Sequence, residues 1–240
     1  MKFSIITVTF NAEKGLPKTI ASVRAQSYKN FELIVIDGMS SDNTLAIIES
    51  NKDIITYSVS ESDKGIYDAM NKGINISNGD FCMFLNAGDA LYNQDVLKDV
   101  NNQIKECSNN AIYIGYADYD NGIKVNTRYP NLTKLPYTFC HQAIFFKTSV
   151  IKKNKYNITF QLSGDSELLY RLIQNGYNYT LINVKVALEE AGVGATESNL
   201  LKSTKELYSI QYLKENVSAL YRLYHLTKIY VYLLLTKLTK

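Results

Sequence analysis

Polar side chains follow four predicted strands of this 240-residue chain, each at the point where the strand ends. They are Asn11 and Glu13 after the first strand, Asp37 and Asp42 after the second, Glu61, Asp63 and Lys64 after the third, and Asn86 and Asp89 after the fourth. In open α/β sheets, ligands bind outside the carboxyl ends of the strands. We therefore expect these side chains to form one polar, mostly acidic rim around a ligand.

The elements that must bring these groups together are strands alternating with helices. Buried strands are expected over 3–10, 31–36, 54–59 and 81–85, where β-branched and apolar residues run together. Helices are expected over 16–27, 42–51, 65–76 and 93–105, with Pro17 in a first turn and Asp42 as an N-cap. This order predicts a mainly parallel sheet, with all four strand ends at one edge.

The second half of the chain has a different pattern. Further strands are expected over 111–117, 123–128, 143–146 and 179–184, and a helix opens at Ser163-Gly164-Asp165. From about residue 200, apolar side chains recur at helical spacing, and lysines flank a final apolar stretch that is too short to span a bilayer. Two interpretations of this tail stay open: contact with an anionic membrane surface, or packing on its own domain or a second subunit.

The composition excludes several classes of protein. Apolar residues make up 46% and charged residues 20% of the chain, which is an ordinary globular balance, and a net charge of +3 gives no reason to expect nucleic acid. Cys82, Cys107 and Cys140 are widely spaced, so neither a zinc site nor a disulfide framework is expected. The first residues have strand character rather than that of a secretory signal. A reducing, cytoplasmic location is expected, extending to the inner face of the cell membrane.

Several separated blocks of sequence resemble the family 2 glycosyltransferases, which are inverting enzymes with the GT-A fold. The blocks are FSIITVTFN, SVRAQSYKNFELIVIDGMSSDNT and SESDKGIYDAMNKGINISNGDFCMFLNAGD, with CHQAIFFK and GDSELLYRL as looser matches. The resemblance implies an α/β fold with a Rossmann-like, mainly parallel central sheet flanked by helices and followed by a C-terminal helical tail. It places a glycosyltransferase domain at 1–200 and the tail at 201–240.

The resemblance places the donor nucleoside between the loops that follow the first two strands. The Asp37 carboxylate can accept a hydrogen bond from the imide N–H of uracil, and Thr9 and Asn11 can reach the base or the ribose. Lys64 and Asp68 stand where the family keeps a variable polar contact to the nucleotide. In the alternative interpretation Asp37 only closes a turn, since Asp-Gly is a turn signal, and the other two charges are solvated.

Asp89 stands where the family has its acidic metal motif, commonly Asp-x-Asp or Asp-Asp. Asn86 and Gly88 replace the earlier acids here, which leaves one carboxylate. Mg²⁺ or Mn²⁺ can bridge phosphates with only one or two protein carboxylates, so Asp89 is sufficient in principle. His141 could touch the diphosphate, the metal or the acceptor, although a lone histidine is more often structural.

Asp165 is the expected general base, because the family has an acid at the start of this helix that deprotonates the acceptor hydroxyl. The family's usual Glu-Asp pair is Gly164-Asp165 here, so the first acid is missing. A structural N-cap role for Asp165 is the alternative, and Glu167 is a rival base.

The function implied by the resemblance is metal-dependent transfer of one sugar, with inversion, from a nucleotide-diphosphate sugar to a hydroxyl acceptor. A UDP-sugar donor and a saccharide or lipid-linked acceptor in cell-surface polysaccharide or oligosaccharide assembly are expected. The absence of a Q-x-x-R-W block favours a single transfer over polymer extrusion. A nucleotidyltransferase and a non-catalytic protein that binds a nucleotide sugar or a partner are the alternatives. The tail is expected to supply a peripheral membrane contact or a homodimer contact.

Overall fold

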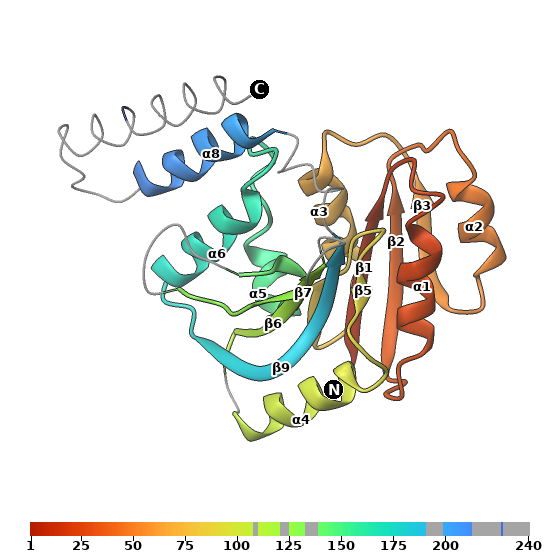
Figure 1. The fold of residues 1–240 in the computed structure, drawn as a ribbon, viewed down its shortest axis with the longest axis horizontal. Helices are drawn as coiled ribbons and strands as arrows, with labels where there is room; N and C mark the ends of the chain where they lie inside the picture. Colours follow the sequence, from red (N-terminus) through yellow and green to blue (C-terminus); the bar gives the residue numbers. More distant parts are fainter. Residues whose placement is uncertain (108–109, 121–124, 133–138, 191–198, 213–226, 228–240) are drawn as a thin grey trace.

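The computed structural model describes residues 1–107, 110–120, 125–132, 139–190, 199–212 and 227. One sheet of nine strands runs through these residues, in the order β3-β2-β1-β4-β8-β6-β9-β5, with β7 paired to β6. Helices cover both faces of this sheet (Figure 1). The α/β class and the Rossmann-like first half predicted from the sequence are confirmed.

The first four strands of the fold are parallel and form the half of the sheet at the right of Figure 1. They are β1 (Phe3–Thr9), β2 (Phe31–Asp37), β3 (Ile55–Ser60) and β4 (Phe81–Phe84). Every residue of β1 and β4 is buried, because the sheet is covered on both faces, and this explains the unbroken apolar runs in the sequence. The loops after these strands therefore meet at one edge, as the sequence predicted.

The other half of the sheet mixes parallel and antiparallel pairs. Its strands are β5 (Ala90–Leu91), β6 (Ile112–Asp120), β7 (Val125–Arg128), β8 (Ile144–Lys147) and β9 (Tyr179–Glu190). Strand β8 joins the two halves, since it pairs antiparallel with both β4 and β6. The long strand β9 then runs parallel to β6 and antiparallel to β5, so it joins β6 to the strand that follows the loop after β4.

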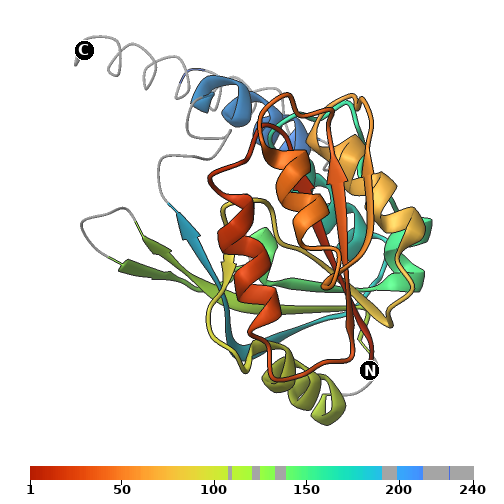
Figure 2. The same cartoon turned by 90° about the vertical axis from the view of Figure 1, so that its right-hand side faces the viewer.

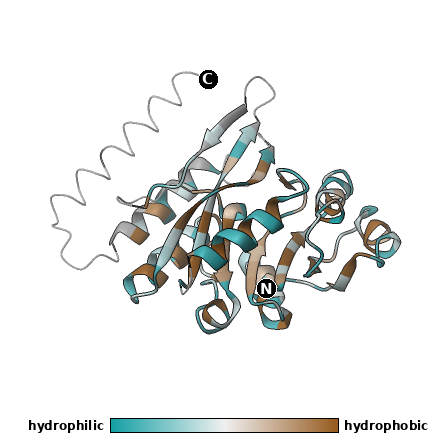
Figure 3. Ribbon diagram, turned by 90° about the horizontal axis from the view of Figure 1, so that it is seen from below, coloured by the Kyte–Doolittle hydropathy of each residue, from teal (hydrophilic) through white to brown (hydrophobic). Residues whose placement is uncertain are grey.

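Helices cover each face of the sheet, and the last described helix packs on another helix rather than on the sheet (Figure 2). They are α1 (Leu16–Arg24), α2 (Thr44–Ser50), α3 (Ile66–Ile76), α4 (Val96–Glu106), α5 (Thr148–Lys153), α6 (Gly164–Gln174) and α8 (Leu200–Tyr212), with a 3₁₀ turn η1 (His141–Ala143). Buried side chains of α1 and α4 belong to one core cluster, and those of α3, α5 and α6 belong to another. In Figure 3 these helices accordingly show hydrophobic residues along one side and hydrophilic residues along the other.

Several boundaries differ from the sequence predictions. Asn43, not Asp42, is the N-cap of α2, although an Asp42 oxygen accepts a hydrogen bond from the N–H of Thr44. Strand β5 and helix α5 were not predicted, and β9 extends six residues past the predicted end at Val184, to Glu190.

Helix α8 forms the described beginning of the tail. The Glu206 carboxylate on α8 accepts hydrogen bonds from the backbone N–H groups of residues 161, 162 and 163, just before α6. The rest of the predicted tail, 213–226 and 228–240, lies outside the described residues. Among the residues that the structure describes, none of the helices is long and apolar enough to cross a membrane.

Candidate active site

A tight turn over 86–89 follows β4 and carries the predicted metal ligand Asp89. Gly88 has φ +106°, a conformation that favours glycine, and a side chain on Gly15 would lie 2.9 Å from the Gly88 Cα. The Thr19 hydroxyl of α1 accepts from the N–H of Gly88 and donates to the carbonyl of Asp89, at 3.0 and 2.7 Å. The two glycines therefore let α1 approach closely enough for Thr19 to hydrogen-bond to the backbone of the turn.

The Asp89 carboxylate is held by side chains from the other half of the sheet. Gln142 Nε2 donates to Asp89 Oδ2. The Cys140 thiol lies 3.1 Å from Gln142 Oε1 and 3.0 Å from an oxygen of Glu189 on β9. Burial raises the pKa of Asp89, the Gln142 hydrogen bond lowers it, and the nearby charge of Glu189 raises it further. A second carboxylate thus lies near Asp89, although the acids expected within the turn are missing.

His141 connects the turn to the predicted base. Asn86 Nδ2 donates to His141 Nε2 at 2.9 Å, so the ring proton lies on Nδ1. That Nδ1 is 4.0 Å from Asp165 Oδ2. Residues 141 and 142, which are consecutive in η1, therefore contact the base side and the metal side of the site respectively.

Asp165 lies in the first turn of α6, two residues past the N-cap, Ser163. Its side chain is 25% exposed, and the Tyr67 hydroxyl donates to Asp165 Oδ1 at 3.4 Å. Burial raises the pKa of Asp165, while His141 lowers it. The rival base Glu167 is only 5% exposed and is paired with Arg171 at 2.7 Å, so it is not available to an acceptor.

Gly164 explains how Tyr67 comes so close to the base. A Cβ at Gly164 would lie 2.7 to 2.9 Å from three carbons of the Tyr67 ring. The ring also stacks on Tyr156, with centroids 5.1 Å apart. The space that a glutamate would need beside Asp165 is therefore filled by an aromatic ring, which supplies a hydroxyl to the carboxylate instead.

The predicted nucleoside contacts lie at the ends of β1 and β2. Asp37 is fully buried, and its carboxylate accepts from the N–H and hydroxyl of Ser40 and from the Ser60 hydroxyl. Asn11 has φ +48°, and its side-chain oxygen accepts from the N–H of Ser41 at 2.9 Å. Thr9 pairs in register with Asp37, and its hydroxyl is buried without a hydrogen-bond partner among the described residues. The structure thus brings Thr9, Asn11 and Asp37 together.

Lys64 lies on the loop that leads into α3, and Asp68 lies in the first turn of that helix. Asp68 Oδ2 accepts from the backbone N–H of Lys64 at 3.0 Å, which closes the first turn of the helix. Both residues line a hollow of about 370 Å³ that is also lined by Tyr67, Phe160 and Leu162. The two charges therefore lie on the side of the candidate base.

The turn after β4 fits a divalent cation shared with phosphates. The buried side-chain oxygen of Asn86 has no hydrogen-bond partner among the described residues, and it lies in the same turn as Asp89. Such oxygen donors suit Mg²⁺ or Mn²⁺. Within the described ranges, no group of three His, Cys, Asp or Glu side chains could enclose a metal. The protein would thus supply only part of the coordination shell, as is usual where phosphates supply the rest.

Sequence reasoning did not assign site roles to Gln142, Glu189 and Tyr67. Gln142 directly follows His141, which was considered as a site residue, so its position in the sequence could have identified it. Glu189 and Tyr67 carried no comparable signal, because their proximity to the two aspartates depends on sheet pairing and on Gly164.

A parallel sheet edge with an acidic turn on one side and a half-buried carboxylate on the other defines a class, the nucleotide-sugar transferases with the GT-A fold. The sequence model of Glycosyl transferase family 2 matches residues 4–166. The chain belongs to this family and is a glycosyltransferase that transfers a sugar from a nucleotide sugar.

A relative in sequence agrees with this assignment, and two solved structures share the fold. A PGL/p-HBAD biosynthesis glycosyltransferase of Mycobacterium bovis is 31% identical over 191 residues, covering 72% of this chain and 70% of that protein. Residues 1–349 of Staphylococcus aureus TarS, in complex with UDP-GlcNAc, superpose with a TM-score of 0.73 at 19% identity, covering 91% of this chain and 68% of that one. The mannosyltransferase PcManGT of Pyrobaculum calidifontis, in complex with GDP-Man and Mn²⁺, superposes with a TM-score of 0.67 at 14% identity, covering 90% and 65%.

Proposed function

We propose that this protein transfers a single sugar from a UDP-sugar to a hydroxyl acceptor with inversion, using Asp165 as base and a divalent cation at Asp89. The observation that carries the proposal is the link between the two aspartates. His141 Nδ1 lies 4.0 Å from Asp165 and the consecutive residue Gln142 donates to Asp89, so the short turn η1 lies between the base and the metal ligand. The inverting course of the reaction requires the base and the leaving group on opposite sides of the anomeric carbon.

The donor nucleoside lies at Thr9, Asn11 and Asp37 in this proposal. The unpartnered Thr9 hydroxyl supports it, because a buried hydroxyl without a hydrogen bond is costly unless a ligand satisfies it. Since the Asp37 carboxylate is enclosed, the uracil imide N–H replaces the hydroxyl of Ser40 or Ser60 as one of its donors. The UDP-GlcNAc bound to TarS supports a uridine donor.

Asp89 and the side-chain oxygen of Asn86 would hold Mg²⁺ or Mn²⁺, with Glu189 adding negative charge nearby. The cation, when bound, neutralises charge on the departing diphosphate. The Mn²⁺ in the PcManGT complex supports this assignment. Lys64, just before α3, and Asp68, in the first turn of that helix, are proposed to contact the donor.

Asp165 takes the proton of the acceptor hydroxyl as its oxygen forms a bond to the anomeric carbon and the bond to the diphosphate oxygen breaks. Burial raises the pKa of Asp165, which makes the carboxylate a stronger base. Tyr67 and the Nδ1–H of His141 face different oxygens of the carboxylate, so they orient it toward the acceptor.

The acceptor approaches Asp165 through the hollow lined by Tyr67. Its lining combines Phe160 and Leu162 with the lysines Lys64 and Lys202. This surface suits a saccharide or lipid-linked acceptor. We place the reaction in the cytoplasm or at the inner face of the cell membrane, with the domain over 1–200 and the tail over 201–240 as a membrane or homodimer contact.

The test is thermal stability with UDP, UDP-sugars and GDP-mannose, each with and without Mn²⁺, followed by a product assay. A ligand that binds the native state raises the midpoint by mass action, by about 2.7 kcal/mol of stability at a hundredfold excess over Kd. We expect a Mn²⁺-dependent rise with UDP that Asp89→Asn abolishes and Asp165→Asn retains.

The control is Asp53→Asn, an exposed carboxylate paired with Arg24, which should bind and turn over like the wild type. Asp165→Asn should lower kcat at least about a hundredfold, the usual contribution of a general base. Release of pyrophosphate would instead identify a nucleotidyltransferase. UDP binding without turnover of any acceptor would identify a non-catalytic protein.

A further inference from the structure

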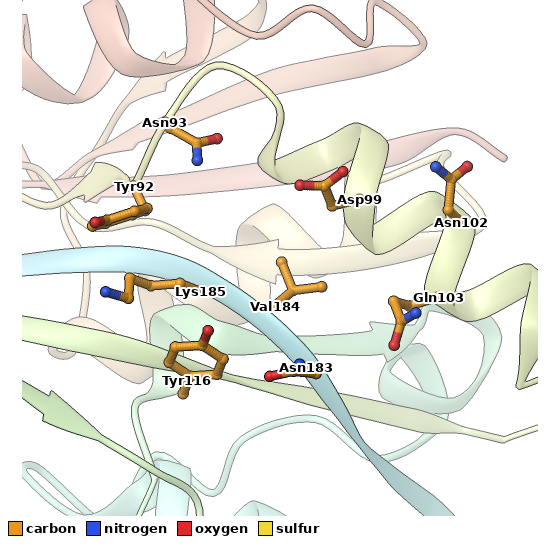
Figure 4. Close-up of a pocket in the computed structure, with 9 residues that line it drawn as sticks. All are labelled: Tyr92, Asn93, Asp99, Asn102, Gln103, Tyr116, Asn183, Val184 and Lys185. Atoms are coloured by element: carbon orange, nitrogen blue, oxygen red, sulfur yellow. The ribbon is translucent and has the colours of Figure 1, made fainter.

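A second hollow lies between β9 and α4 (Figure 4). It has a volume of about 470 Å³, and Tyr92, Tyr116, Asn183 and Lys185 are among the residues that line it. None of the predicted site residues lines it. Its chemistry therefore has to be considered separately from that of the donor site.

The charges in this hollow do not suit an anion. Lys185 is the only cation among the described lining residues, and its Nζ donates to Asp118 at 2.8 Å. The same ammonium group lies 4.4 Å from the centre of the Tyr92 ring. Asp99 adds a negative charge from α4. A phosphate or nucleotide would meet no free positive charge here.

An apolar ligand does not fit either. Val184 is the one aliphatic residue in the lining, and it is 6% exposed, so little hydrocarbon surface is available. A lipid chain gains its binding energy from such surface, at about 25 cal/mol per Å² buried.

The remaining groups are aromatic rings and side-chain amides. Four amides line the hollow: Asn93, Asn102, Gln103 and Asn183. Each amide offers both donors and acceptors, which matches the hydroxyl groups of a sugar, since these also donate and accept. Tyr92 is 43% exposed, and the neighbouring Tyr116 packs on Tyr129, which is 65% exposed. Aromatic faces of this kind cover the C–H faces of sugar rings.

We propose that this hollow binds a neutral oligosaccharide. Its place in the fold gives it a use, because Tyr92 follows Asp89 by three residues and Lys185 precedes Glu189 by four. At about 3.3 Å per residue, the hollow lies roughly 13 Å along β9 from the metal side of the site. A glycan acceptor longer than one sugar can be held at both places. This last role rests on the proposed function, whereas the binding itself does not.

The binding test uses the full chain and four neutral hexasaccharides: α-1,4-glucan, β-1,4-glucan, chitin and α-1,6-mannan fragments. Saturation-transfer NMR and titration calorimetry measure binding, with UDP and Mn²⁺ present to fill the donor site. We expect millimolar or tighter binding of at least one hexasaccharide, weakened at least tenfold by Tyr92→Ala and by Asn183→Ala. Glucose 1-phosphate should bind no more tightly than glucose.

Tyr57→Ala is the matched control, because Tyr57 is 44% exposed on β3, at the far end of the sheet. Asn183 is exposed on a strand, so its variant keeps the test valid if Tyr92→Ala fails to fold. The proposal is overturned if no hexasaccharide binds, if binding survives in both hollow variants, or if Tyr57→Ala weakens it equally. Saccharide binding by a protein that fails to bind UDP would uphold this site and contradict only the proposed donor reaction.

Discussion

Replacement of Gly164 by alanine tests how the fold positions the base. The new Cβ would lie 2.7 Å from a Tyr67 ring carbon, while ordinary carbon–carbon contact is about 3.5 Å or more, so the ring must move by roughly 0.8 Å. Tyr67 is 6% exposed and stacks on the buried Tyr156, which leaves it little room. Overpacking of this kind costs about 1–3 kcal/mol.

The net effect of Gly164→Ala is smaller than the overpacking cost, because alanine favours a helix over glycine by about 0.5–1 kcal/mol. We expect a net loss of up to about 2.5 kcal/mol, which lowers Tm by up to about 10 °C in a chain of this size. The hydrogen bond from the Tyr67 hydroxyl to Asp165 is already long at 3.4 Å, so a shift of the ring away from Asp165 breaks it. We expect kcat to fall about tenfold while the donor KM is unchanged.

A double-mutant cycle with Tyr67→Ala separates the clash from other causes. Without the ring, the three closest contacts of the new Cβ are gone and the helix preference of alanine remains. Gly164→Ala should then change sign and stabilise the Tyr67→Ala background by about 0.5–1 kcal/mol. Thermal melts of the four proteins give the coupling, and equal effects of Gly164→Ala in both backgrounds would refute the argument.

Two further predictions concern the charged groups of the site. Burial raises the folded-state pKa of Asp89. The cost in folding free energy of charging this carboxyl is therefore absent below the ordinary carboxyl pKa and grows as pH rises through the raised value. Asp89→Asn should raise the metal-free Tm at pH 7 but not near pH 3, and an equal rise at both pH values would contradict this. His141 lowers the pKa of Asp165, so His141→Phe should shift the acidic limb of the plot of kcat against pH to higher pH. Lys98→Phe is the surface control. An unmoved limb in His141→Phe would exclude an effect of His141 on Asp165.

The parallel half of the fold could be predicted because each strand is buried on both faces. Such strands read as continuous apolar runs, as β1 and β2 do. Strand β5 is two residues long, which is too short to leave a periodic pattern. The end of β9 was missed because Lys185 and Glu189 interrupt its apolar run, and both side chains face polar partners.

The candidate site residues could be chosen one by one from the sequence, but the connection between them could not. Asp89 and Asp165 each follow a recognisable element, whereas the link between them runs through residues 141 and 142, more than fifty positions after the first aspartate. That link exists because β8, directly after η1, pairs antiparallel with β4. Strand register of this kind depends on tertiary pairing and is not readable from local sequence.

The pairing of β4 with β8 also explains why the turn over 86–89 has only one carboxylate, that of Asp89. Asn86 uses its Nδ2 to donate to His141 Nε2, which leaves the proton on Nδ1, facing Asp165. An aspartate at position 86 could only accept a hydrogen bond from His141 Nε2. The imidazole would then need a proton on both ring nitrogens to face Asp165 with an Nδ1–H. Negative charge near Asp89 comes instead from Glu189 on β9, across Cys140 and Gln142. The amide nitrogen at position 86 therefore contacts His141, while the buried side-chain oxygen of Asn86 has no hydrogen-bond partner among the described residues.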